Sequence, residues 1–133
     1  MSTQETRKVV ETVFRAYEAG SLEPFFDCVA DDVRWTVVGS HPLAGTFTSK
    51  KEFIEKRFEK LKGRLQQPPT CSVTRITVED DVAVVEFQGG ATTVTGRPYN
   101  NWYCWVLTVA NGRITEMTNY LDSQLVVELF ADT

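Results

Sequence analysis

The fold of this chain is decided by residues 101–122, which read NWYCWVLTVANGRITEMTNYLD. Two strand-like runs flank the Asn-Gly pair at 111–112, a strong short-range signal for a tight β-hairpin. Successive side chains of a strand point to opposite faces, so Asn101, Tyr103 and Trp105 share one face of the predicted sheet. That face combines aromatic rings with polar groups, which is typical of a pocket for a mostly apolar organic ligand.

The rest of the sequence predicts helices first and strands afterwards. Residues 2–5 and 49–52 each have the spacing of a helix-capping box, and apolar residues then recur at helical intervals. After residue 70 the apolar pattern changes to alternation. The predicted elements are helices over residues 2–20 and 21–30, a strand over 33–38, a loop over 39–45, a helix over 49–63, strands over 71–79 and 82–95 and the two of the hairpin, and a helix over 123–130.

These elements predict an α+β fold in a single domain, residues 1–133. The four strands after residue 70 should form an antiparallel meander with one face packed by helices. The pair Gly89-Gly90 lies where a long strand would bend around a bulge. A sheet curved in this way around the first helix would enclose a conical cavity.

Composition excludes several classes of function. The 18 acidic and 14 basic residues give a net charge of -4, so neither nucleic acid nor a membrane surface is an expected partner. The basic residues between 50 and 64 alternate with glutamates and indicate a solvated helix face. Three cysteines without CxxC spacing predict neither a metal site nor a disulfide framework. With no leader-like or membrane-spanning segment in view, we expect a cytoplasmic protein.

The order of these elements resembles the NTF2-like superfamily, and more narrowly its SnoaL-like and ketosteroid-isomerase-related members. The resemblance covers essentially the whole chain. It implies a cone-shaped, cystatin-like roll with an apolar cavity, frequently a homodimer joined through the outer sheet face. The residues that carry it are Gly20-Ser21-Leu22-Glu23, Ala30-Asp31-Asp32-Val33, Trp35 with Gly39, Pro42-Leu43-Ala44-Gly45, Gly96-Arg97-Pro98-Tyr99-Asn100-Asn101, Asn111-Gly112-Arg113-Ile114 and Tyr120-Leu121-Asp122.

The chain departs from the ketosteroid isomerases at the positions of their chemistry. Those enzymes use a tyrosine on the first helix, a general-base aspartate and a protonated aspartate that holds the oxyanion. The corresponding places fall near Val13, Thr36 and Trp105. None of these three side chains supplies the same proton chemistry, so true ketosteroid isomerase activity is not expected.

Three residues are candidate catalytic groups. Asp122 is either a general acid or base near the cavity, as a Tyr-x-Asp in related proteins implies, or the N-cap of the helix that follows. His41 is the only histidine and lies in a loop, where it is either catalytic or simply exposed. Glu86 lies on a central strand and either faces solvent or acts as a carboxylate held inside.

Five residues are candidate ligand contacts: Trp35, Asn101, Tyr103, Trp105 and Tyr120. Core filling would also explain the tryptophans, since one sheet face must be buried in any case. Asn101 would equally well bond to local backbone groups. Buried amides and phenols need hydrogen-bond partners, and a ligand is one possible source of them.

The sequence therefore supports two functional hypotheses. The first is a SnoaL-like isomerase, cyclase or hydrolase that needs no cofactor or metal and acts on a small apolar organic substrate. Its acid or base would be Asp122, His41 or Glu86, with Tyr103 and Asn101 orienting the substrate. The second is a non-catalytic ligand-binding or dimerisation module that has the pocket without the proton-transfer groups.

Overall fold

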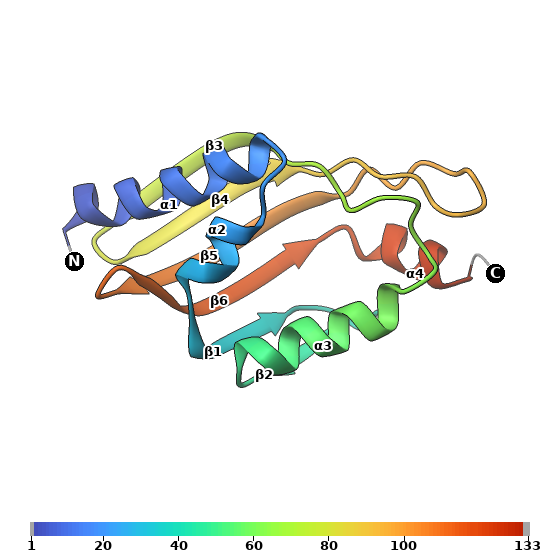
Figure 1. The fold of residues 1–133 in the computed structure, drawn as a ribbon, viewed down its shortest axis with the longest axis horizontal. Coiled ribbons are helices and arrows are strands. Elements are labelled where there is room, and N and C mark those ends of the chain that lie inside the picture. Colours follow the sequence, from blue (N-terminus) through green and yellow to red (C-terminus); the bar gives the residue numbers. More distant parts are fainter. Residues whose placement is uncertain (1, 132–133) are drawn as a thin grey trace.

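The computed structural model describes residues 2–131 and consists of a curved six-stranded sheet with three helices packed across one face (Figure 1). The strand order is β2-β1-β6-β5-β4-β3. In chain order the elements are α1 (Thr3–Glu18), α2 (Glu23–Cys28), β1 (Val29–Val37), β2 (Gly45–Phe47), α3 (Lys50–Leu61), β3 (Ser72–Glu79), β4 (Val82–Gln88), β5 (Trp102–Ala110), β6 (Arg113–Leu121) and α4 (Ser123–Ala131).

The α+β class and the antiparallel meander β3-β4-β5-β6 are confirmed. The sheet also contains one parallel pair, in which β1 runs beside β6 with Trp35 opposite Met117. The short strand β2 pairs with β1 at the sheet edge. The parallel pair joins the first third of the chain to the last, and this brings Trp35 onto the same sheet face as the hairpin residues.

Several predicted boundaries differ from the structure. The second helix ends at Cys28 rather than at residue 30, because Val29 already belongs to β1 and is fully buried opposite Ile114. The predicted loop contains the start of β2. Strand β4 ends at Gln88 instead of continuing through a bulge. A Cβ atom on Gly89 would lie 2.9 Å from the Tyr103 ring, so glycine allows this ring to approach the end of the strand.

The first helix begins as its sequence predicts. The Ser2 hydroxyl accepts from the Glu5 amide at 3.1 Å, and the Glu5 carboxylate accepts from the Ser2 amide at 3.2 Å. The second predicted box is only half formed, since the Glu52 carboxylate accepts from Thr48 rather than from Ser49. Both helices therefore begin at a serine cap, but only the first helix has both hydrogen bonds of the capping box.

The three helices on the inner sheet face each contribute a phenyl ring to the core. Phe14 of α1 lies 6.0 Å from Trp105, Phe25 of α2 lies 5.4 Å from Trp105, and Phe53 of α3 stacks on Trp35 at 3.5 Å, all measured between ring centroids. Burial of such rings contributes most of the apolar area of the core. Within residues 2–131, no helix is long and apolar enough to span a bilayer.

Candidate functional site

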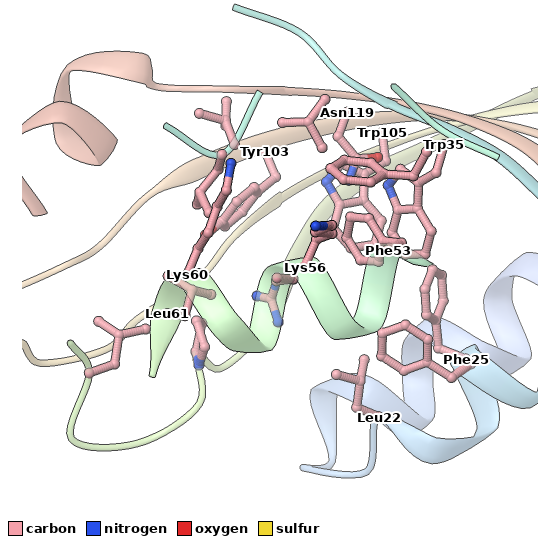
Figure 2. Close-up of a pocket in the computed structure, with 18 of the residues that line it drawn as sticks. Leu22, Phe25, Trp35, Phe53, Lys56, Lys60, Leu61, Tyr103, Trp105 and Asn119 are labelled. Atoms are coloured by element: carbon pink, nitrogen blue, oxygen red, sulfur yellow. The ribbon is translucent and has the colours of Figure 1, made fainter. Parts of the chain in front are cut away.

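The inner face of the sheet encloses a cavity between α2, α3 and strands β1, β5 and β6 (Figure 2). Its volume is about 70 Å³. A single water needs only ~10–15 Å³ measured in this way, so the interior is not solid at this point. The predicted hollow is present, but it lies beside α2 and α3 rather than against the first helix, from which Tyr17 alone among the described residues lines it.

Aromatic side chains make up nine of the twenty described residues that line the cavity. They come from three helices, from β1, β2 and β5, and from the loop before β5, and the tryptophans predicted at the site are among them. Trp35 and Trp105 approach each other edge to face, with ring centroids 6.1 Å apart. Such a wall offers stacking and edge contacts to a ring system. The aromatic members are Tyr17, Phe25, Phe26, Trp35, Phe47, Phe53, Tyr99, Tyr103 and Trp105.

Three polar atoms of the wall have no hydrogen-bond partner among the described residues. They are the indole Nε1 atoms of Trp35 and Trp105 and the Oδ1 atom of Asn119. Trp105 and Asn119 are direct cross-strand neighbours, so two of these atoms belong to one part of the sheet. Buried donors without a protein partner are rare, because each costs desolvation free energy. A polar atom of a bound molecule would satisfy them.

Tyr103 projects into the cavity from β5 and is connected to a buried chain of polar groups. Its phenol interacts electrostatically with that of Tyr99, whose hydroxyl accepts from Asn101 Nδ2 at 3.1 Å. Burial raises the pKa of the Tyr103 phenol well above its usual range. Tyr103 is therefore a protonated hydrogen-bonding group across all ordinary pH values.

A cationic rim borders the opening of the cavity, formed by Lys56, Arg57 and Lys60 of α3. The sequence interpretation treated these side chains as part of a solvated face and missed them as a site. The signal was nevertheless present, because Arg57 follows the buried Phe53 by four residues and precedes the cavity residue Leu61 by four. Residues four apart lie on the same side of a helix.

Asn101 does not line the cavity, although Tyr103 and Trp105, which were predicted on the same face, do. Its side chain is fully buried and makes four hydrogen bonds. Oδ1 accepts from the amides of Trp102 and Asp122, while Nδ2 donates to the Tyr99 hydroxyl and the Asp122 carbonyl. All donor and acceptor positions of the amide are occupied. Asn101 thus holds the ends of β5 and β6 together.

Glu86, Tyr120 and Asp122 lie instead along a groove of about 440 Å³ on the outer sheet face. Glu86 forms an ion pair with Arg75 of β3, and the hydrogen bond from this guanidinium lowers the pKa of the carboxyl group. Tyr120 is 47% exposed. The Asp122 carboxylate accepts from the Gln124 amide at 3.0 Å and so caps α4.

His41 lies in neither the cavity nor the outer groove. It is only 5% exposed, and both ring nitrogens bond to its own loop. Nδ1 accepts from the Leu43 amide at 3.2 Å, which leaves Nε2 to donate to the Val38 carbonyl at 3.0 Å. The ring closes the loop that precedes β2.

The structure therefore divides the eight sequence-predicted site residues into groups. Trp35, Tyr103 and Trp105 come together in the inner cavity. The three candidate catalytic side chains do not, and among the described residues the cavity lining contains no aspartate, glutamate or histidine. No cluster of three or more potential metal-ligating His, Cys, Asp or Glu side chains occurs within residues 2–131.

The fold is shared with many solved structures. An NTF2-like protein from Burkholderia thailandensis is 21% identical over 98% of both chains, with a TM-score of 0.79. TerC, co-crystallised with polyporic acid, is 16% identical over 96% of this chain and 99% of that chain, with a TM-score of 0.78. An LEH-like epoxide hydrolase from M. tuberculosis is 19% identical over 97% and 91%, with a TM-score of 0.69.

Similarity at the sequence level identifies the family. No curated protein matches the chain at a significant level. The model of the SnoaL-like domain matches residues 10–117. This match spans α2, α3, most of the sheet and every residue of the cavity lining except Asn119 and Leu121. The chain therefore belongs to the family of proteins with a SnoaL-like domain.

Proposed function

We propose that this protein binds a small, ring-bearing, largely apolar organic molecule in its inner cavity. The observation that carries the proposal is the cavity wall, in which nine aromatic side chains surround two indole N–H groups without protein partners. Rings would pack against the wall, and an oxygen atom of the ligand would accept from Trp35 or Trp105.

Two of the similar structures support this reading of the site. TerC was crystallised with polyporic acid, and another relative is described as an epoxide hydrolase. The fold itself does not specify a reaction, because one fold hosts many functions. The wall residues of this chain themselves support a bound ligand.

The test is direct binding of methyl 2-naphthoate, an uncharged two-ring ester with one carbonyl oxygen. Two tryptophans line the cavity, so we expect saturable quenching of tryptophan fluorescence, with one site per chain in calorimetry. Phe53→Ala removes the ring that stacks on Trp35 and should weaken binding. Phe58→Ala on the same helix is the control, because its side chain is 67% exposed. Equal loss in both variants, or no saturable binding of either this ester or its parent acid, would refute the proposal.

A SnoaL-like isomerase, cyclase or hydrolase without a cofactor is the second candidate. The observation in its favour is Tyr103, a buried phenol that faces the cavity and retains its proton. Such a group can hydrogen-bond to a carbonyl oxygen that gains negative charge during a reaction. Binding is the better supported function, since Asp122, His41 and Glu86 lie outside the cavity lining.

The enzyme hypothesis is tested by deuterium exchange. The protein is incubated in D₂O with 2-tetralone, a two-ring ketone with acidic C–H bonds, and exchange is followed by NMR. Catalysis predicts exchange above the buffer rate that falls at least tenfold in Tyr103→Phe while binding persists. Exchange at the buffer rate would leave ligand binding alone.

We also propose that the protein forms a homodimer through the outer sheet face. Trp102 is 56% exposed there and Tyr120 is 47% exposed, with Cys104 and Val106 half-buried on the same face. Exposed aromatic patches of this kind usually mark an interface. The groove that contains Glu86 and Asp122 would then lie at the subunit contact.

Finally, we propose a reducing location, the cytoplasm. Cys28, Cys71 and Cys104 are all free thiols, and they come from different parts of the fold. Oxidising compartments favour disulfides in small domains. Three unpaired thiols fit a compartment that keeps cysteines reduced.

A further inference from the structure

We propose that the ligand of the inner cavity is an organic acid, with its rings against the aromatic wall and its carboxylate against Arg57 and Lys56 of α3. This inference rests on the proposed function, because it assumes that the cavity binds a small molecule. It adds the charge of the ligand and the direction in which it lies.

The first observation is an excess of positive charge at the cavity. Lys56, Arg57 and Lys60 all line it, and no carboxylate from the described residues does. Lys60 donates to the Pro42 carbonyl at 2.6 Å. Lys56 and Arg57 have neither an ion pair nor a hydrogen bond to any side chain or carbonyl within residues 2–131. Both cations are therefore available to an external anion.

Other lysines of α3 behave differently. Lys50 lies 3.5 Å from the Asp31 carboxylate and donates to the Phe26 carbonyl. Lys51 lies 4.0 Å from Glu55, one helical turn further on. The two lysines outside the cavity lining thus have acidic partners, whereas none of the three cations that line the cavity forms an ion pair with a described residue. A helix that merely solvated its charges would not separate them in this way.

The second observation is the reach of the Arg57 charge into the cavity. Arg57 is half-buried, and its positive charge lowers the pKa values of Tyr17, Tyr99 and Tyr103, partly opposing the effect of burial. These three phenols come from α1, the loop before β5, and β5. The guanidinium therefore lies where the aromatic wall and the opening meet, and Lys56, the preceding residue of α3, also lines the cavity (Figure 2).

A carboxylate is the anion that suits this place. The planar guanidinium of arginine forms two parallel hydrogen bonds to a carboxylate, and partial burial strengthens them relative to water. The stems of lysine and arginine are apolar and can border the ring system. An amine of the same shape would meet three cations and no carboxylate, so the site discriminates against it.

The experiment compares two probes that differ in charge and little in shape, 2-naphthoate and its methyl ester. At pH 7.5 and low salt we expect the acid to bind at least tenfold more tightly than the ester. Arg57→Gln should weaken the acid by about tenfold and the ester by less than twofold, the expected loss of one charge-assisted contact. Lys56→Gln changes an exposed position and should have the same kind of effect as Arg57→Gln, weakening the acid more than the ester.

Lys51→Gln is the matched control, because it removes the same charge from the same helix outside the cavity lining. It should alter neither affinity by more than twofold. Equal binding of acid and ester, unchanged in Arg57→Gln and Lys56→Gln, would overturn the anion inference and leave the proposed function intact. Absence of binding by both probes would overturn the proposed function itself. If Lys51→Gln weakened binding of the acid as much as Arg57→Gln does, the acid would be attracted only by the overall charge of the helix. This result would also refute the inference.

Discussion

The Asn101 side chain forms hydrogen bonds with both backbone polar groups of Asp122. Its Oδ1 accepts from the Asp122 amide at 2.9 Å, and its Nδ2 donates to the Asp122 carbonyl at 3.2 Å. The same side chain donates to the hydroxyl of Tyr99, which itself lines the cavity. One buried amide thus fixes the start of α4 and the position of a cavity phenol.

Asn101→Ala should lower the free energy of unfolding by about 2–3 kcal/mol, since it leaves several buried backbone and phenol groups without partners. Urea unfolding followed by circular dichroism measures the change. Asn100→Ala, next to it but exposed, should cost less than about 0.5 kcal/mol. Similar losses of unfolding free energy in the two variants would show that the Asn101 hydrogen bonds contribute nothing specific.

Trp105→Phe keeps a ring in the wall but removes the indole N–H that lacks a protein partner. We expect affinity for methyl 2-naphthoate to fall about fivefold, the value of one modest hydrogen bond. Trp102→Phe changes the same residue type on the opposite face of β5 and should leave affinity unchanged. Calorimetry measures both affinities. Unchanged affinity in Trp105→Phe would show that this N–H does not bind the ligand.

Stability should decline in alkali because of Cys71. Burial, with a smaller effect of Glu18, raises the pKa of this thiol to about 12 from an ordinary value of 9.0. The unfolded chain loses the proton near pH 9 and the folded chain does not. The stabilisation is therefore complete below pH 9 and is lost as pH rises toward 12, by at most ~1.4 kcal/mol per pH unit.

In Cys71→Ala, the free energy of unfolding should fall less steeply with pH, by up to ~1.4 kcal/mol per pH unit. Urea unfolding between pH 8.5 and 10.5 measures this difference. Cys104→Ala is the comparison, because its thiol is only half-buried and its pKa is raised less. Parallel pH curves for the wild type and Cys71→Ala would contradict the role of Cys71.

Trp102→Lys should convert a dimer to a monomer in sedimentation velocity, because it introduces a charge at the centre of the proposed interface. Phe58→Lys is the control, since this ring is 67% exposed on α3, away from the outer sheet face. A monomeric wild type at micromolar concentration would disprove the interface.

Much of the fold could be predicted because its signals are local. The Ser2 capping box, the turn at Asn111-Gly112 and the alternation in residues 101–109 act between near neighbours in the chain. The parallel pairing of β1 with β6 could not be predicted in this way, since it joins Trp35 to Met117 across most of the chain. Helix α3 also has exposed apolar side chains, since Ile54 is 40% and Phe58 is 67% exposed.

The sequence by itself determined the order of helices and strands, and it determined that Tyr103 and Trp105 share a face, because strand geometry fixes which residues point together. Only the tertiary structure decided which face the helices cover. Alternation is the same for both faces of a sheet, so it could not tell that Glu86 and Tyr120 lie outside while Tyr103 lies inside. The spacing of Phe53, Arg57 and Leu61 places them on one side of α3, but only the docking of α3 on the sheet decided that this side borders the cavity.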